Sequence, residues 1–154
     1  MDLLVISVGL RMPAWVAEGW NEYARRMPPH LPLNLIEVAT AGKKNAGRER
    51  ESEAALLAER IPDRARRIAL HGAGKPWTTE ILARNLADWQ HDGDPICFLI
   101  GGAEGLAPEL LASCQSRWAL GPAVFPHMIV RILVAEQLYR ASTILSGHPY
   151  HRGR

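Results

Sequence analysis

The 154-residue sequence has few cysteines, no long apolar run and little net charge. Its two cysteines, Cys97 and Cys114, are too few for a disulfide framework and too far apart for a close-spaced metal motif, so we expect buried, reduced thiols. Even the most apolar stretch, 128–145, contains three charged residues and falls short of the roughly 20 apolar residues that cross a bilayer. The start of the chain lacks the basic residues and long apolar core of a signal peptide. We therefore predict a soluble, cytoplasmic protein that does not enter a membrane.

The small net charge and the lack of hydrolase and dinucleotide-binding motifs make several classes of function improbable. A net charge of +2 is too small for a protein that binds free nucleic acid through contacts with many phosphates. If the protein binds RNA, we expect a small contact area with few phosphate contacts. No nucleophile lies in a G-x-S-x-G turn, which leaves hydrolase chemistry without support. The first apolar run ends in VGLRMP rather than in a phosphate-binding glycine loop, which argues against a dinucleotide-binding fold.

The residues that are present fit one globular domain over 1–154, with 47% hydrophobic and 22% charged residues. Strands are expected at 2–8, 33–39, 67–70, 96–100 and near 117–120, and helices at 14–27, 49–61, 78–90, near 108–113 and 127–146. Thr78 is the expected N-cap of the third helix, and the glycine-rich segment 71–76 is expected to be a turn. Strands that alternate with helices predict an α/β fold with a mostly parallel sheet, helices on both faces and ligands at the carboxyl ends of the strands.

Two glycine-rich segments follow predicted strands. The loop GGAEG at 101–105 lets the backbone approach a ligand closely, although a tight turn with Glu104 as a solvated acid explains the same letters. In HGAGKPWT, Lys75 and Trp77 suit a phosphate and a base, although a turn with a half-buried Trp is the simpler interpretation.

The last seven residues, HPYHRGR, concentrate two His, one Tyr and two Arg. These side chains can stack on bases, hold phosphates and move protons, whereas the simpler alternative is a frayed polar terminus. No acid or cysteine nearby completes a zinc site with the two His residues, so no metal is expected. The basic cluster Lys43, Lys44, Arg48 and Arg50 suits either an RNA backbone contact or a solvated helix face.

The final predicted helix, 127–146, carries apolar residues over more than the single stripe that a surface helix needs. One face is expected to cover the sheet and another to contact a second subunit. The sequence therefore predicts a homodimer.

Five segments in this order and spacing resemble the RlmH family over the whole chain: VGLRMPAWV, GKPW, LIGGAEG, FPHMIVRILVAEQLYRA and HPYHR. The resemblance implies a SPOUT fold with a C-terminal trefoil knot, S-adenosylmethionine (SAM) as cofactor and a homodimer. It also implies methylation of N3 of a pseudouridine in the intersubunit hairpin of 23S rRNA, on assembled 70S ribosomes. Two alternatives remain: a SPOUT methyltransferase that acts on tRNA or on an unmodified uridine, and a catalytically silent RNA-binding or ribosome-associated module.

Candidate residues fall into two groups, one implied by the resemblance and one by the chemistry of the reaction. The cofactor-binding residues that it implies are Leu70, Gly102, Gly121, Pro122, Ala123, Val124, Phe125 and Pro126. Catalysis needs groups that orient an RNA base and remove the proton from its N3 atom. The first candidates are His148, Tyr150, His151 and Arg152, and Glu104 is a further one. The residue types do not decide which of these groups is the base.

Overall fold

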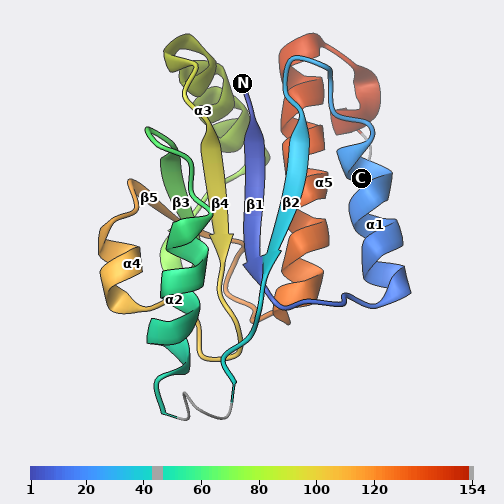
Figure 1. The fold of residues 1–154 in the computed structure, drawn as a ribbon. Coiled ribbons are helices and arrows are strands. Elements are labelled where there is room, and N and C mark those ends of the chain that lie inside the picture. Colours follow the sequence, from blue (N-terminus) through green and yellow to red (C-terminus); the bar gives the residue numbers. More distant parts are fainter. Residues whose placement is uncertain (43–46, 153–154) are drawn as a thin grey trace.

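The computed structural model describes residues 1–42 and 47–152 and contains one parallel five-stranded sheet (Figure 1). The strands lie in the order β2-β1-β4-β3-β5, with bounds β1 Leu3–Val8, β2 Leu33–Val38, β3 Arg66–Pro76, β4 Ile96–Ile100 and β5 Ser116–Ala119. The helices are α1 Ala14–Ala24, α2 Glu49–Glu59, α3 Thr79–Asp92, α4 Pro108–Ala112 and α5 His127–Ser146, followed by the 3-10 turn η2 Pro149–Arg152. The predicted α/β architecture with a parallel sheet is confirmed.

Helices cover both faces of this sheet. Every residue of β4 is buried, as expected of a central parallel strand made of an unbroken apolar run. One core layer joins the sheet to α1, α3 and α5, and a second joins it to α2 and α4. Both cysteines are free, and burial raises the pKa of the Cys97 thiol to about 12, so this thiol stays protonated.

Local capping signals place α3 as the sequence predicts. The Thr78 hydroxyl accepts a hydrogen bond from the Ile81 amide at 3.1 Å, which satisfies one of the free N–H groups of the first turn. At the other end Gly93 adopts φ = +78°, the left-handed conformation in which glycine ends a helix without strain. The N-cap prediction is confirmed, and the helix ends two residues later than expected.

The segment 71–76 is part of β3, so the prediction of a turn there is wrong. Leu70 and Lys75 both lie opposite Trp118 of β5, which means that the chain leaves the ladder after Leu70 and returns to it at Lys75. A Cβ atom at Gly74 would lie 2.5 Å from the Arg117 carbonyl oxygen, so only glycine fits this close approach. Trp77, half-buried, stacks on Trp118 with ring centroids 5.4 Å apart, which supports the packing interpretation of this residue.

Helix α5 lies between α1 and α3 (Figure 1), and this arrangement accounts for part of its broad apolar surface. Gly19 of α1 allows close approach, because a Cβ atom there would lie 2.8 Å from the Ile132 side chain. Thr79 donates a 2.7 Å hydrogen bond to Gln137 on the side of α3. Apolar residues on several faces of α5 are therefore not by themselves a sign of a second subunit.

No helix among the described residues is long and apolar enough to span a membrane. Strand order and helix packing alone do not define a knot, so the trefoil knot stays a prediction.

Candidate functional site

Three loops meet at the edge of the sheet where the parallel strands end, at the bottom of Figure 1. Strands β4, β3 and β5 are neighbours, so the chain after Ile100, the irregular part of β3 after Leu70, and the chain after Ala119 emerge side by side. Leu70 is half-buried and is the last residue of β3 before the shift of register. The topology thus brings the predicted cofactor-binding residues to one edge, where parallel sheets bind ligands.

The loop after β4 is a compact glycine turn. The Gly105 amide donates a 3.0 Å hydrogen bond to the Gly102 carbonyl, and Gly105 adopts φ = +76°. A Cβ atom at Gly101 would lie 2.6 Å from the Gly105 carbonyl carbon, so a side chain at 101 would open the turn. Glu104 is exposed at its tip. The interpretation of 101–105 as a tight turn is therefore correct. The turn also presents backbone groups at the end of β4, where a ligand can contact them.

The side chain of Glu53 occupies the space beside Gly102. A Cβ atom at Gly102 would lie 2.9 Å from Glu53 Oε1, 3.2 Å from Glu53 Oε2 and 3.2 Å from Val8 Cγ1. Glu53 belongs to α2 and is only 6% exposed. Its Oε2 atom accepts a 3.2 Å hydrogen bond from the Ala41 amide, whereas Oε1 is buried with no partner among residues 1–42 and 47–152. Sequence reasoning missed this residue.

The segment 121–126 leads directly into α5. Gly121 adopts φ = +125°, a conformation that favours glycine, and Pro122 to Pro126 are exposed. Phe125 is 39% exposed and Val124 is 96% exposed. At the start of α5, burial lowers the pKa of His127, the charge of Arg131 lowers it further, and Glu53 opposes the shift. His127 is therefore neutral at pH 7.

Arg131 ties α5 to the ends of β1 and β2. Its side chain is fully buried and donates to the Gly9 carbonyl at 2.7 Å, the Val8 carbonyl at 3.2 Å and the Ser7 hydroxyl at 2.9 Å. It also forms a 2.7 Å ion pair with Glu37 of β2. The sequence shows Arg131 only as a charge within an apolar helix. The structure makes it the residue that satisfies the backbone where β1 ends.

The C-terminal residues 148–152 are docked against α5, so the frayed-terminus alternative does not hold for them. The Tyr150 ring lies 4.6 Å from the Tyr139 ring, and the Arg140 guanidinium lies 4.8 Å from the Tyr150 centroid. The Tyr150 hydroxyl donates to Glu136 at 3.1 Å. Burial, and then the neighbouring Glu136 carboxylate, raise the pKa of Tyr150 above its ordinary value, so this phenol keeps its proton.

The two histidines and the arginine of this tail differ in exposure. His148 is exposed, and its Nδ1 atom accepts a 3.1 Å hydrogen bond from the Tyr150 amide. His151 is half-buried, and its Nδ1 atom has no partner within the described part of the chain. Arg152 is exposed. The exposed imidazole of His148 and the exposed guanidinium of Arg152 can therefore contact a further molecule at this surface.

The tail and the cofactor loops lie at opposite ends of α5 within one chain (Figure 1). A helix of 20 residues is about 30 Å long. The tail folds back along it as far as Glu136, which is about 14 Å from the first residue of α5. The structure therefore does not bring Glu104 and Gly102 together with His148 and Arg152 in one protomer.

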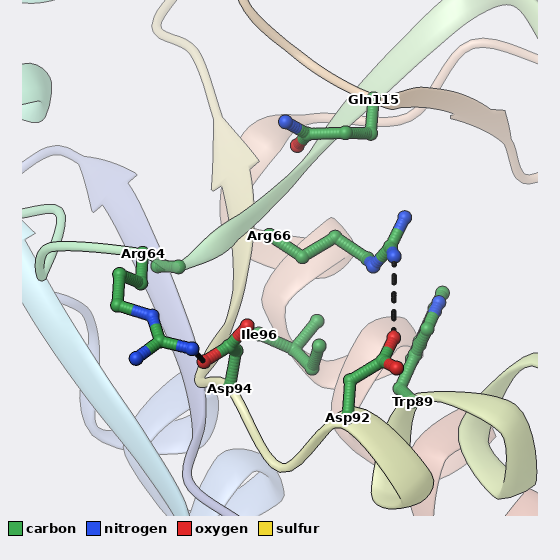
Figure 2. Close-up of a pocket in the computed structure, with 8 residues that line it drawn as sticks. Arg64, Arg66, Trp89, Asp92, Asp94, Ile96 and Gln115 are labelled. Atoms are coloured by element: carbon green, nitrogen blue, oxygen red, sulfur yellow. Dashed lines mark ion pairs between the residues drawn. The ribbon is translucent and has the colours of Figure 1, made fainter.

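A separate pocket of about 120 Å³ lies at the other edge of the sheet, where β3 and β4 begin (Figure 2). Its two arginines are matched by acids, because Arg64 lies 3.3 Å from Asp94 and Arg66 lies 3.6 Å from Asp92. It is remote from the predicted cofactor loops.

Neither edge, within residues 1–42 and 47–152, holds a group of three or more His, Cys, Asp or Glu that could bind a metal ion. Lys43, Lys44 and Arg154, which the sequence suggested as candidate RNA contacts or as part of the tail, lie outside the described residues. Arg48 and Arg50 of the same basic cluster are exposed around the start of α2.

Comparison with known proteins finds similar sequences over nearly the whole chain. Residues 1–151 match the family described as predicted SPOUT methyltransferase. The chain is 48% identical to the ribosomal RNA large subunit methyltransferase H of Azotobacter vinelandii and 47% identical to that of Pseudomonas aeruginosa, over 99% of this chain and 100% of each relative.

Solved structures agree at the level of the fold. A probable methylase family protein from Haemophilus influenzae superposes with a TM-score of 0.54 at 13% identity, over 97% of this chain and 69% of that one. A structure described as giving insights into 2-OH methylation of C/U34 on tRNA superposes with a TM-score of 0.50 at 18% identity, over 95% and 97% of the two chains.

Proposed function

This chain belongs to the SPOUT methyltransferase family, and from that membership we propose that it is a SAM-dependent rRNA methyltransferase of the bacterial cytoplasm. Its target is N3 of a pseudouridine in 23S rRNA, in the intersubunit hairpin of assembled ribosomes. The observation that carries the proposal is full-length identity of 48% to a protein named ribosomal RNA large subunit methyltransferase H.

The edge formed by the loops after β4, β3 and β5 fits a nucleotide-like cofactor. Glycine turns present backbone there, and a carboxylate oxygen with no partner among residues 1–42 and 47–152 is buried beside Gly102. We assign the cofactor to Leu70, Gly102 and the segment 121–126. When bound, SAM supplies an electrophilic methyl group on a sulfonium.

The chain needs no nucleophile of its own for this reaction, and its task is to orient the base, exclude water and take up a proton. Loss of the N3 proton would leave an electron pair on the pseudouridine base for the new N–CH₃ bond, and bound SAM would supply the methyl group and leave as S-adenosylhomocysteine, with the electron pair of the broken S–CH₃ bond on sulfur. His148, His151 and Arg152 are the groups proposed to position the base and manage its proton, and Arg152 favours the N3 anion. Tyr150 keeps its proton and serves as a stacking and anchoring group.

A homodimer would bring the cofactor loops of one chain together with the C-terminal tail, residues 148–152, of the other. In a two-fold dimer the tail of one protomer can lie against the loops of its partner. Exposed apolar side chains are available for such an interface: Val124 and Phe125 directly before α5, and Leu10 and Trp15 between β1 and the first turn of α1. We therefore propose that each active site is built from both chains.

Equilibrium sedimentation tests the dimer. At micromolar concentration we expect a dimer, since an active site divided between two chains requires one. Trp15→Glu places a charge on an exposed apolar residue of α1 and should shift the mass toward the monomer, whereas Glu18→Gln on the exposed face of the same helix should not. An active parent protein that sediments as a monomer would contradict the proposal.

Substitution of Gly102 tests the cofactor loops. Gly102→Val should weaken SAM binding about tenfold or more, close to 1.4 kcal/mol, because the new side chain must displace Glu53 or open the turn. Titration calorimetry of folded protein gives the affinity. Gly42→Ala is the control, because a Cβ atom there has no neighbour within 4 Å. Equal SAM affinity in parent and Gly102→Val would count against this assignment.

Methyl transfer from radiolabelled SAM tests the proposed substrate. We expect label in 23S rRNA when purified protein meets 70S ribosomes from cells that lack this modification. Transfer to tRNA instead would establish the tRNA alternative. Failure to bind SAM or to label either RNA would favour the silent RNA-binding module.

A further inference from the structure

The buried carboxylate of Glu53 lies beside the proposed cofactor loops but has no role assigned to it so far. It is held in one orientation, because the Ala41 amide binds Oε2 at 3.2 Å. Its other oxygen faces Gly102 and has no partner within residues 1–42 and 47–152. A buried acceptor without a partner costs free energy, and a buried charge without a counter-charge costs more. A ligand that bears both a donor and a positive charge would remove both costs.

We propose that Glu53 binds the α-ammonium group of SAM through Oε1. This inference rests on the proposed function, because it requires the cofactor at the Gly102 turn. The sulfonium of SAM is positive but has no N–H or O–H donor, and the ribose hydroxyls and adenine amine are donors without charge. Only the ammonium combines both properties, and charge-assisted hydrogen bonds are the stronger kind.

The placement of Glu53 also brings its carboxylate close to position 102. The carboxylate fills the volume that any side chain at 102 would need, at 2.9 Å from the Cβ position. Glu53 reaches this point from α2, on the face of the sheet covered by α2 and α4, while the glycine turn follows β4. The amino-acid part of the cofactor therefore lies toward α2, and Glu53 is a specificity-determining residue for ligands that carry it.

Glu53→Gln isolates this contact. The amide oxygen can still accept from Ala41, whereas an NH₂ group replaces the acceptor that faces the ligand. Glu51→Gln is the matched control, because it removes the same charge from an exposed position of the same helix. Calorimetry with SAM, S-adenosylhomocysteine and 5′-methylthioadenosine separates the parts of the cofactor. The second ligand lacks the sulfonium charge, and the third also lacks the amino acid.

In Glu53→Gln we expect SAM and S-adenosylhomocysteine to bind about tenfold or more weakly, and methylthioadenosine to bind as to the parent. Glu51→Gln should bind all three as the parent does. Thermal unfolding checks that each variant is folded. If Glu53→Gln does not fold, Glu53→Asp provides the test, because its retracted carboxylate should weaken the same two ligands.

Each other result overturns the assignment in a distinguishable way. Equal loss for methylthioadenosine would assign Glu53 to the nucleoside, and loss for SAM alone would assign it to the sulfonium charge. No loss for any ligand would make Glu53 a packing residue. A parent protein that binds none of the three would overturn the proposed function itself.

Discussion

A protein truncated after Gly147 should remain folded, bind SAM and transfer no methyl group to ribosomes. The truncation removes the histidines and the arginine assigned to the RNA base, while α5 keeps its glycine cap at 147. SAM affinity should change little, because the tail is assigned to the RNA base and not to the backbone contacts that hold the cofactor. Ribosome methylation, titration calorimetry and thermal unfolding give the three readouts.

A mixing experiment then shows whether the tail acts in the partner's site. At a SAM concentration well below the Kd of the parent, truncated protein should be inactive and Gly102→Val protein should keep about a tenth of the parent activity or less, but mixed dimers would pair intact loops with an intact tail. Random mixing should recover about a quarter of the parent activity, since half of the dimers then hold one complete site. No recovery from mixed dimers would place the tail in its own chain's site. Full activity of the truncated protein would make the tail a structural appendage.

Replacement of Arg131 should cause the largest loss of stability. Arg131→Met removes the donors that satisfy the Val8 and Gly9 carbonyls and leaves Glu37 without its ion pair. Loss of one partner of such a buried network costs about 3 kcal/mol or more. For a chain of this length, that corresponds to a fall in Tm of roughly 6–12 °C.

Thermal unfolding at fixed protein concentration measures this effect, because the Tm of a dimer depends on concentration. Arg84→Met on α3 is the control, since Arg84 is exposed and its loss should change stability by less than about 0.5 kcal/mol. Arg131→Lys should be intermediate, because it keeps the charge and loses the fork of donors. A Tm equal to the parent in Arg131→Met would show that water replaces these contacts.

Apolar periodicity and capping residues were sufficient to predict the order and type of most elements. The unbroken run ICFLI predicts a doubly covered strand, and it is the buried centre of the sheet. The same approach gave a wrong prediction for 71–76, because the glycines and proline of this segment favour a turn. There, contact of Gly74 with the β5 backbone outweighs local propensity.

The sites were predictable where backbone or a distinctive motif defines them. Glycines after strands and the HPYHR motif point to the loops and the tail, although only the structure shows that α5 separates them. Glu53 and Arg131 were not predictable. A single acid in an acid-rich helix and a single base in an apolar helix have ordinary surroundings in sequence, and their burial depends on contacts with distant strands.

The most direct test of the proposed activity is nucleoside analysis of 23S rRNA by mass spectrometry after reaction with SAM. Two ribosome preparations are needed, one with the target pseudouridine and one in which that position is still uridine. The account predicts 3-methylpseudouridine in the first preparation and little or no methylation in the second. Methylation of both to the same extent, or of neither, would contradict it.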